Sequence, residues 1–130
     1  MGILGCSTAE YVHMSMNYQI KENNMLTVLI RYKGSNGSAR KFVNEMISSG
    51  IVEQIRKEQG NLRYEYFFPQ NDDETVLLVD SWINQEALDK HHKLPLMNKI
   101  KELRDKYDLH MEVEKYQPII DEKDEKYIRR

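Results

Sequence analysis

The chain has 130 residues, a length that suits one domain and is too short for two, and its formal net charge is −2. The slight acidic balance argues against a nucleic-acid partner, because nucleic-acid-binding domains carry a basic excess on one face. No apolar run approaches the roughly 20 residues of a membrane span. We therefore expect no membrane partner.

Residues 1–24 form an N-terminal extension with two separate signals. Apolar and polar residues alternate between 11 and 20, which predicts an extra strand that joins a sheet edge or reaches a partner subunit. Residues 1–6 faintly resemble a lipidation signal, but the apolar stretch is too short for a signal peptide. We interpret them as a non-native or mis-started leader. The single cysteine, Cys6, excludes an internal disulfide and fits a reducing, cytoplasmic location.

Residues 25–60 read as a strand followed by a helix. Residues 25–32 are rich in Leu, Val and Ile, which predicts the strand, and a Gly- and Ser-containing break follows it. Ser38 is the expected N-cap of the helix. Apolar residues recur every four positions, which predicts one amphipathic helix ending at Gly60; they are Val43, Ile47, Ile51 and Ile55.

Two strands come next. Residues 61–68 predict a second strand whose aromatic stripe consists of Tyr64, Tyr66 and Phe68. A polar turn over 69–73 leads to a third strand at 75–82. The stripe favours core or interface packing. If it faces the helices instead, Tyr64 and Tyr66 are candidates for binding an aromatic substrate by stacking and hydroxyl contacts.

A divided helical region and a last strand complete the pattern. Asn84 is a good N-cap, and the helical region it starts is interrupted near Pro95 before running to about Tyr107. Residues 110–116 predict a fourth strand. The charged segment 121–130 reads as a solvated tail or a short helix.

The third strand is apolar on both faces. Val76 and Leu78 share one face, while Leu77 and Val79 share the other, so both faces favour burial. Two helices cover only one face of a four-stranded sheet. We therefore predict a homodimer through the sheet face. The alternative, which we rank second, is that the terminal segments cover that face.

Trp82 ends the third strand, and His91 lies nine residues later on the following helix. Histidine titrates near neutral pH, so His91 is a candidate general base or hydrogen-bond donor in a small, dry pocket walled by Trp82. Asp80 points to the same face as Trp82 and is costly to bury alone, so we expect it to pair or to mark a polar spot. The alternative is a core tryptophan and a half-buried histidine with a backbone or carboxylate partner, for example Asp89 or Asp80.

Other candidate sites are weaker. Arg31, at the end of the first strand, is a candidate for attracting an anionic substrate group, although such an arginine more often pairs with a surface carboxylate. His92 points about 100° away from His91, which argues for a rim position and against a shared metal ion. His13 and His110 are distant in sequence, so we expect no metal site.

Several motifs are absent from the sequence. It contains no Gly-rich nucleotide or phosphate loop and no Gly-x-Ser-x-Gly elbow, so we expect neither a nucleotide cofactor nor serine-hydrolase chemistry. Any redox chemistry would then run on the substrate's own electrons.

The segment from the third strand onward resembles the antibiotic biosynthesis monooxygenase family. The features that carry the likeness are Asp80, Trp82, the run Glu86-Ala87-Leu88-x-x-His91 and Pro95. The resemblance covers roughly residues 25–118, including 25–28 and 58–64. It implies an α+β fold of the ferredoxin-like βαββαβ type, with a four-stranded antiparallel sheet assembled as a dimeric α/β barrel. Residues 119–130 would then be a charged C-terminal tail.

The resemblance also implies an activity. Members include cofactor-independent monooxygenases, so we expect oxidation of a quinol or small hydroxyaromatic by dioxygen, with His91 taking a phenolic or benzylic proton and without metal or flavin. Leu78 and Leu88 replace the Asn and Tyr of the aromatic-polyketide oxygenases, and Leu96 replaces a second His of the quinol-type pattern.

The remaining alternatives come from other branches. The haem-degrading branch has an Asn on the first strand and a second Trp, where this chain has Arg31 or its neighbours and His91, so haem degradation is not expected. Residues 58–64 resemble the autoinducer-processing branch, which implies a small-carbonyl isomerase. A non-catalytic, dimeric small-ligand-binding protein is the third hypothesis.

Overall fold

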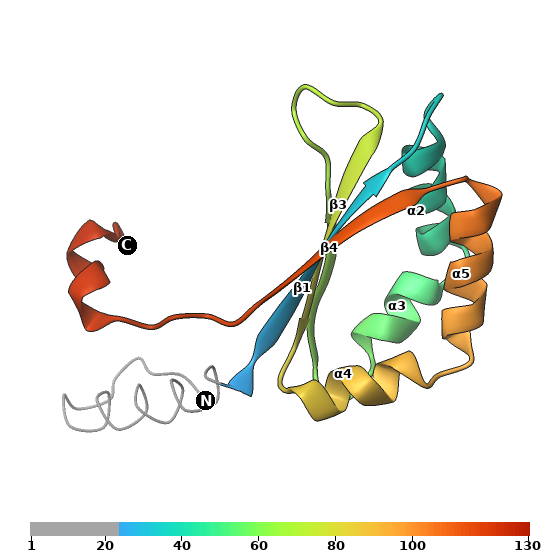
Figure 1. Ribbon diagram of the computed structural model, residues 1–130. Coiled ribbons are helices and arrows are strands. Elements are labelled where there is room, and N and C mark those ends of the chain that lie inside the picture. The colour runs from blue at the N-terminus through green and yellow to red at the C-terminus, as the bar shows by residue number, and fades with distance from the viewer. Residues whose placement is uncertain (1–23) are drawn as a thin grey trace.

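The computed structural model describes residues 24–130, which form a four-stranded antiparallel sheet with helices on one side (Figure 1). The order in the sheet is β2-β3-β1-β4, and the strands are β1 (Leu26–Lys33), β2 (Asn61–Phe67), β3 (Thr75–Trp82) and β4 (His110–Tyr116). The predicted α+β, ferredoxin-like βαββαβ arrangement is confirmed. The strand predicted over 11–20 and the lipidation-like residues 1–6 lie outside the described residues.

The helices cover one face of the sheet (Figure 1). They are α2 (Ser38–Ser48), α3 (Ile51–Arg56), α4 (Gln85–His92) and α5 (Leu96–Lys106). A short 3₁₀ helix, η1 (Glu122–Tyr127), is fully exposed and stands apart from the sheet at the end of an extended segment. Within residues 24–130, no helix combines the length and apolarity that a bilayer crossing requires.

The single helix predicted between Ser38 and Gly60 is wrong, because the chain turns at Gly50. Gly50 has a φ of 82°, in the left-handed region that glycine adopts without strain, and it separates α2 from α3. Ile47, which the predicted stripe buries, is 57 % exposed. Ser38 is the first helical residue rather than the N-cap, a position that Gly37 takes with a φ of 79°.

The helix-facing side of the sheet carries the core. Tyr32, Val76, Leu78 and Trp82 are almost completely buried there. Across the sheet, Leu29, Leu77 and Val79 are only partly buried, and helices α2–α5 all lie on the other side (Figure 1). The two-sided apolar character predicted for β3 therefore leaves one apolar face uncovered among the described residues.

The edge strand β4 is exposed along its whole length. Its pairing with β1 sets Met111 opposite Tyr32 and Val113 opposite Ile30, so both side chains are on the helix-facing side of the sheet. Met111 is nevertheless 37 % exposed and Val113 54 % exposed. The helices thus leave the inner side of β4 exposed.

Candidate functional site

A buried histidine–carboxylate pair lies between α4 and the turn after α3. His91 is 3 % exposed, and its Nδ1 lies 2.9 Å from Oε2 and 3.0 Å from Oε1 of Glu58. An ionised carboxylate can only accept, so Nδ1 carries the hydrogen and donates it. In the neutral ring, Nε2 then keeps its lone pair. The pair therefore orients an imidazole that can act as a base through Nε2.

Local sequence explains how the two side chains meet. The Asn84 side chain accepts a hydrogen bond from the backbone N–H of Ala87 at 2.8 Å and starts α4, as predicted. Gly60 has a φ of 90°, and a Cβ added there would lie 2.6 Å from the Cβ of Ala87. Only glycine lets the turn approach α4 so closely. This contact brings Glu58 within reach of His91.

Trp82 lies against the other side of this pair. It is completely buried, and its ring centroid is 4.7 Å from that of His91 with an interplanar angle of 34°. Its Nε1 donates a hydrogen bond to Oδ1 of Asp80 at 2.8 Å. The expectation that Asp80 pairs is confirmed. The carboxylate that binds His91 is Glu58, and not Asp80 or Asp89, which the alternative interpretation named.

Asp80 is poised to change its charge near neutral pH. Burial raises the pKa of its carboxyl to about 7, the hydrogen bond from Trp82 opposes that rise, and the negative charge of Glu58 adds to it. The indole is therefore flanked by two acid–base groups, the Asp80 carboxyl and the His91 imidazole.

Tyr64 and Tyr66 face the helices. This is the orientation in which the sequence made them candidates for binding an aromatic substrate. Tyr64 is 3 % exposed and lies directly across from Asp80, and its ring meets that of Tyr66 edge-on at 5.8 Å. Burial raises the pKa of both phenols. Phe68 does not continue the stripe, because it lies beyond β2 and is 41 % exposed with the Arg40 guanidinium over its ring.

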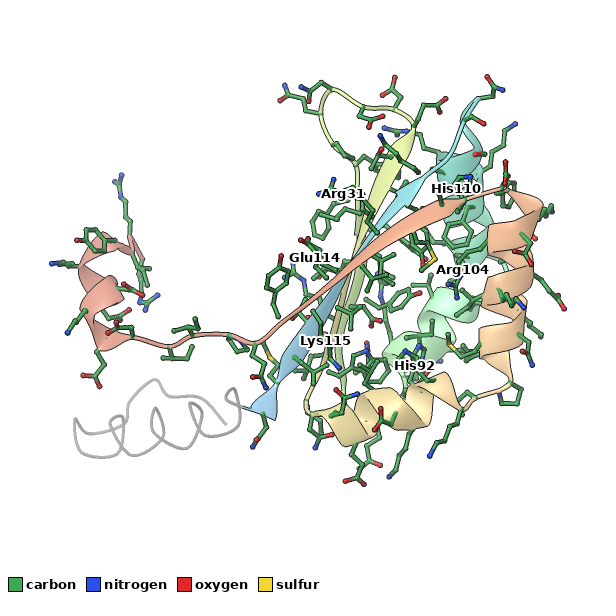
Figure 2. The ribbon with its side chains drawn as sticks, viewed as in Figure 1. Arg31, His92, Arg104, His110, Glu114 and Lys115 are labelled. Atoms are coloured by element: carbon green, nitrogen blue, oxygen red, sulfur yellow. The ribbon has the colours of Figure 1, made fainter. Side chains whose placement is uncertain are left out.

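The structure does not bring Arg31 to this group. Arg31 is exposed on the uncovered face of the sheet, across from Leu77 and Glu112. In Figure 2 it lies on the opposite side of β4 from His92 and Arg104. With Leu29 and Leu77 it lines a surface hollow on that face. The small pocket predicted beside His91 and Trp82 is not seen within the described residues: neither residue lines this hollow or those at β2 and at the start of α4, and the His91 ring is packed against Trp82 and Glu58.

Glu58 and Arg104 belong to the helix-facing side of the sheet, and the sequence interpretation missed both. Glu58 is 33 residues from its partner, so no helical or strand periodicity could link the two. The sequence signal for Glu58 was its position two residues before Gly60, the glycine that lets this turn approach α4. Within residues 24–130, no group of three or more His, Cys, Asp or Glu side chains is arranged to hold a metal ion.

Comparison with known proteins identifies one family and several solved structures of similar fold. A family model described as antibiotic biosynthesis monooxygenase matches residues 25–103. A conserved protein from Bacteroides thetaiotaomicron, a possible oxidoreductase, is 18 % identical with a TM-score of 0.65, and the match covers 74 % of this chain and 99 % of that one. A conserved protein from Methanosarcina mazei is also 18 % identical, with a TM-score of 0.67 and coverages of 78 % and 99 %.

A third similar structure has a stated activity. SnoaB from Streptomyces nogalater, a cofactor-independent oxygenase, is 11 % identical with a TM-score of 0.64, and the match covers 76 % of this chain and 97 % of that one. No match was found among curated proteins. At these identities the structural likenesses establish the fold alone.

Proposed function

Because the chain belongs to the antibiotic biosynthesis monooxygenase family, we propose that it is a cofactor-independent monooxygenase acting on a quinol or related small hydroxyaromatic. The observation that carries the proposal is the buried Glu58–His91 pair stacked on Trp82. It supplies an oriented base beside an aromatic wall, out of contact with bulk water. The likeness to SnoaB, a cofactor-independent oxygenase, supports the same reaction class.

His91 starts the proposed reaction. Its Nε2 takes a proton from the substrate, and the Glu58 carboxylate stabilises the imidazolium that forms. The substrate anion gives one electron to dioxygen, and the two radicals join through a new carbon–oxygen bond. The peroxide anion takes the proton back from the His91 imidazolium, and the resulting hydroperoxide loses water. One oxygen atom stays on the substrate as a carbonyl, the other leaves in the water, and the substrate supplies all four electrons.

The proposed route to the base runs along the inner side of β4. Met111 and Val113 leave this side exposed, and Tyr66 lies further in on the same face of the sheet. A flat aromatic substrate would enter there and place its reacting carbon near His91. Asp80, with a pKa of about 7, is a second group on this face that can exchange a proton.

A homodimer belongs to the same proposal. Leu29, Leu77 and Val79 form a partly buried apolar patch on the uncovered face, and a second copy of the sheet would bury it. The two sheets would then form the α/β barrel that the family resemblance implies. We also propose a cytoplasmic location, since the lone Cys6 fits a reducing compartment.

The second candidate is a small-carbonyl isomerase. The observation that favours it is the position of Glu58, which lies in the stretch 58–64 that resembles the autoinducer-processing branch and directly holds His91. In this reaction the imidazole would move a proton between adjacent carbons, and no oxygen would be consumed.

Oxygen consumption tests the first proposal. A panel of reduced quinones is assayed with an oxygen electrode in the presence of a chelator, comparing the wild type with His91→Gln. His110→Gln is the control, because His110 is exposed at the start of β4. We expect uptake that His91→Gln lowers and His110→Gln leaves unchanged. Uptake no faster than in buffer, or equal in His91→Gln, contradicts oxygenation; deuterium exchange into a carbonyl compound without oxygen use would favour the isomerase.

A further inference from the structure

Two buried donors on the helix-facing side have no hydrogen-bond partner among residues 24–130. They are Nε of Arg104, on α5, and the hydroxyl of Tyr66, on β2. A buried donor without a partner costs free energy, so native proteins keep few of them. These two groups are free to bind a ligand that accepts hydrogen bonds.

Arg104 and Tyr66 interact electrostatically, and both belong to the layer between the sheet and the helices. Burial is the largest cause of the raised pKa of Tyr66; the Tyr64 hydroxyl beside it and, to a smaller extent, the positive charge of Arg104 oppose the rise. The same charge opposes the rise that burial causes in the pKa of Tyr32, which reaches about 12. The Tyr66 ring meets the Phe42 ring edge-on at 6.4 Å.

Arg104 lacks a carboxylate partner among the ion pairs of the described part of the chain. Its Nη1 donates to Sδ of Met111 at 3.0 Å, and a thioether sulfur is a weak acceptor. A partly buried guanidinium normally takes a carboxylate or phosphate in bidentate fashion. The planar edge that includes Nε is therefore available to an oxyanion.

The surrounding charges favour an anion as well. Burial is the first cause of the lowered pKa of His92, electrostatic interactions with His91, Lys115 and Arg104 lower it further, and the negative charge of Asp89 opposes them. Figure 2 shows Arg104 and His92 between β4 and the helices. Asp80, whose charge adds to the raised pKa of Tyr66, is itself bound by the Trp82 Nε1–H.

We propose that Arg104 and Tyr66 bind an oxyanion of the aromatic substrate, a carboxylate or an ionised phenol, at the inner side of β4. The aromatic nature of the ligand rests on the proposed function, whereas the anionic group rests on the two unpartnered donors. Met111 and Val113, which are exposed on this side, leave the approach open. The substrate class thereby narrows to hydroxyaromatics with a second, anionic substituent.

Binding of matched probes tests the proposal without any turnover. Calorimetric titrations under nitrogen compare gentisate, its neutral methyl ester and an ionised nitrophenol with the wild-type protein. We expect gentisate to bind at least about 10-fold more tightly than the ester, the scale expected for a charge-assisted hydrogen bond. If the nitrophenolate also binds tightly, the site accepts both kinds of planar oxyanion. If it does not bind, the site is specific for carboxylates.

Variants then assign the preference to the two residues. Arg104→Gln should remove it, and Tyr66→Phe should reduce it several-fold. Lys101→Gln is the matched control, because Lys101 is an exposed cation on the same helix. Since no acceptor for the Tyr66 hydroxyl is present among residues 24–130, Tyr66→Phe should change the free energy of unfolding by no more than about 1 kcal/mol. A loss of binding without a loss of stability is not expected from a structural role.

Equal affinity of the wild type for gentisate and its ester, including no binding of either, overturns the proposal. So does an unchanged preference in both variants. If Arg104→Gln does not fold, the ester comparison and Tyr66→Phe still decide. Oxygen uptake is a separate readout: a protein that binds gentisate but consumes no oxygen contradicts the monooxygenase activity and leaves the anion site standing.

Discussion

Glu58 holds His91 from a position 33 residues earlier in the chain, with 2.9 Å between Oε2 and Nδ1. The carboxylate is itself 15 % exposed and the imidazole 3 % exposed, so the contact is largely shielded from water. This shielding strengthens the hydrogen bond and holds one tautomer of the ring. The contact joins the turn after α3 to the middle of the site.

Loss of the Glu58 charge should reduce activity without unfolding the protein. In Glu58→Gln the amide oxygen can still accept from Nδ1, but the imidazolium formed during proton transfer loses its stabilising charge. We expect kcat/KM to fall by about 10²-fold, at the lower end of the contribution of a general base, and its pH profile to shift.

Glu53→Gln is the control for this prediction, because Glu53 is an exposed acid on α3 that pairs with Lys57 at the surface. Steady-state kinetics over a range of pH values checks both variants. Identical kcat/KM and pH profiles for Glu58→Gln and the wild type would show that the carboxylate does not assist the histidine.

The buried carboxyl of Asp80 should make stability decrease as pH rises. Its folded pKa of about 7 lies above the ordinary value of 3.8, so the folded state binds more protons between these values. The contribution is complete below about pH 4 and is lost as pH rises through about 7. By linkage it amounts to roughly 4 kcal/mol at most.

Asp80→Asn tests this, since the amide oxygen can still accept from Trp82 Nε1. Urea unfolding of both proteins from pH 4 to pH 8 gives the free energies of unfolding. The wild type should lose stability relative to the variant across this range. A difference that does not change with pH would mean that Asp80 is ionised throughout.

The close approach at Gly60 predicts a destabilising variant. Gly60→Ala adds a methyl group 2.6 Å from Ala87 Cβ, at a φ of 90° that alanine seldom adopts. We expect a loss of about 2 to 4 kcal/mol, the sum of backbone strain and a displaced turn. Activity should fall in parallel because Glu58 moves away from His91.

Gly37→Ala separates the two causes. Gly37 has a similar φ of 79°, but an added Cβ meets nothing within 4 Å. It should therefore lose about 1 kcal/mol, from strain alone. Urea unfolding measures both variants, and equal losses would argue against a steric contact between the turn and α4.

The uncovered sheet face predicts dimerisation. A charge introduced by Val79→Glu would lie in the proposed interface and should convert a dimer to a monomer, because burying an unpaired carboxylate is costly. Ile47→Glu is the control, since Ile47 is 57 % exposed on α2. Light scattering after size-exclusion chromatography gives the masses. A monomeric wild type, or a Val79→Glu dimer as stable as the wild type, would contradict the proposed assembly.

Much of the fold follows from local patterns. The bounds predicted for β3 and β4 agree with the structure, as do the Asn84 cap and the division of the helical region at Pro95. Alternation with period two, caps and proline act on neighbouring residues, so a sequence shows them directly. The break at Gly50 was missed because an i+4 repeat continues across it.

The sequence by itself determined that Trp82 and His91 would belong to one buried group, because a short strand–helix connection leaves them little freedom. Only the tertiary structure decided that Glu58 is the partner of His91 and that Arg31 lies on the other side of the sheet. It also decided that Nε of Arg104 and the Tyr66 hydroxyl find no acceptor within the described residues. Such pairings depend on how closely separate elements pack, as at Gly60. That distance is set by side-chain volumes from distant parts of the chain rather than by any local repeat.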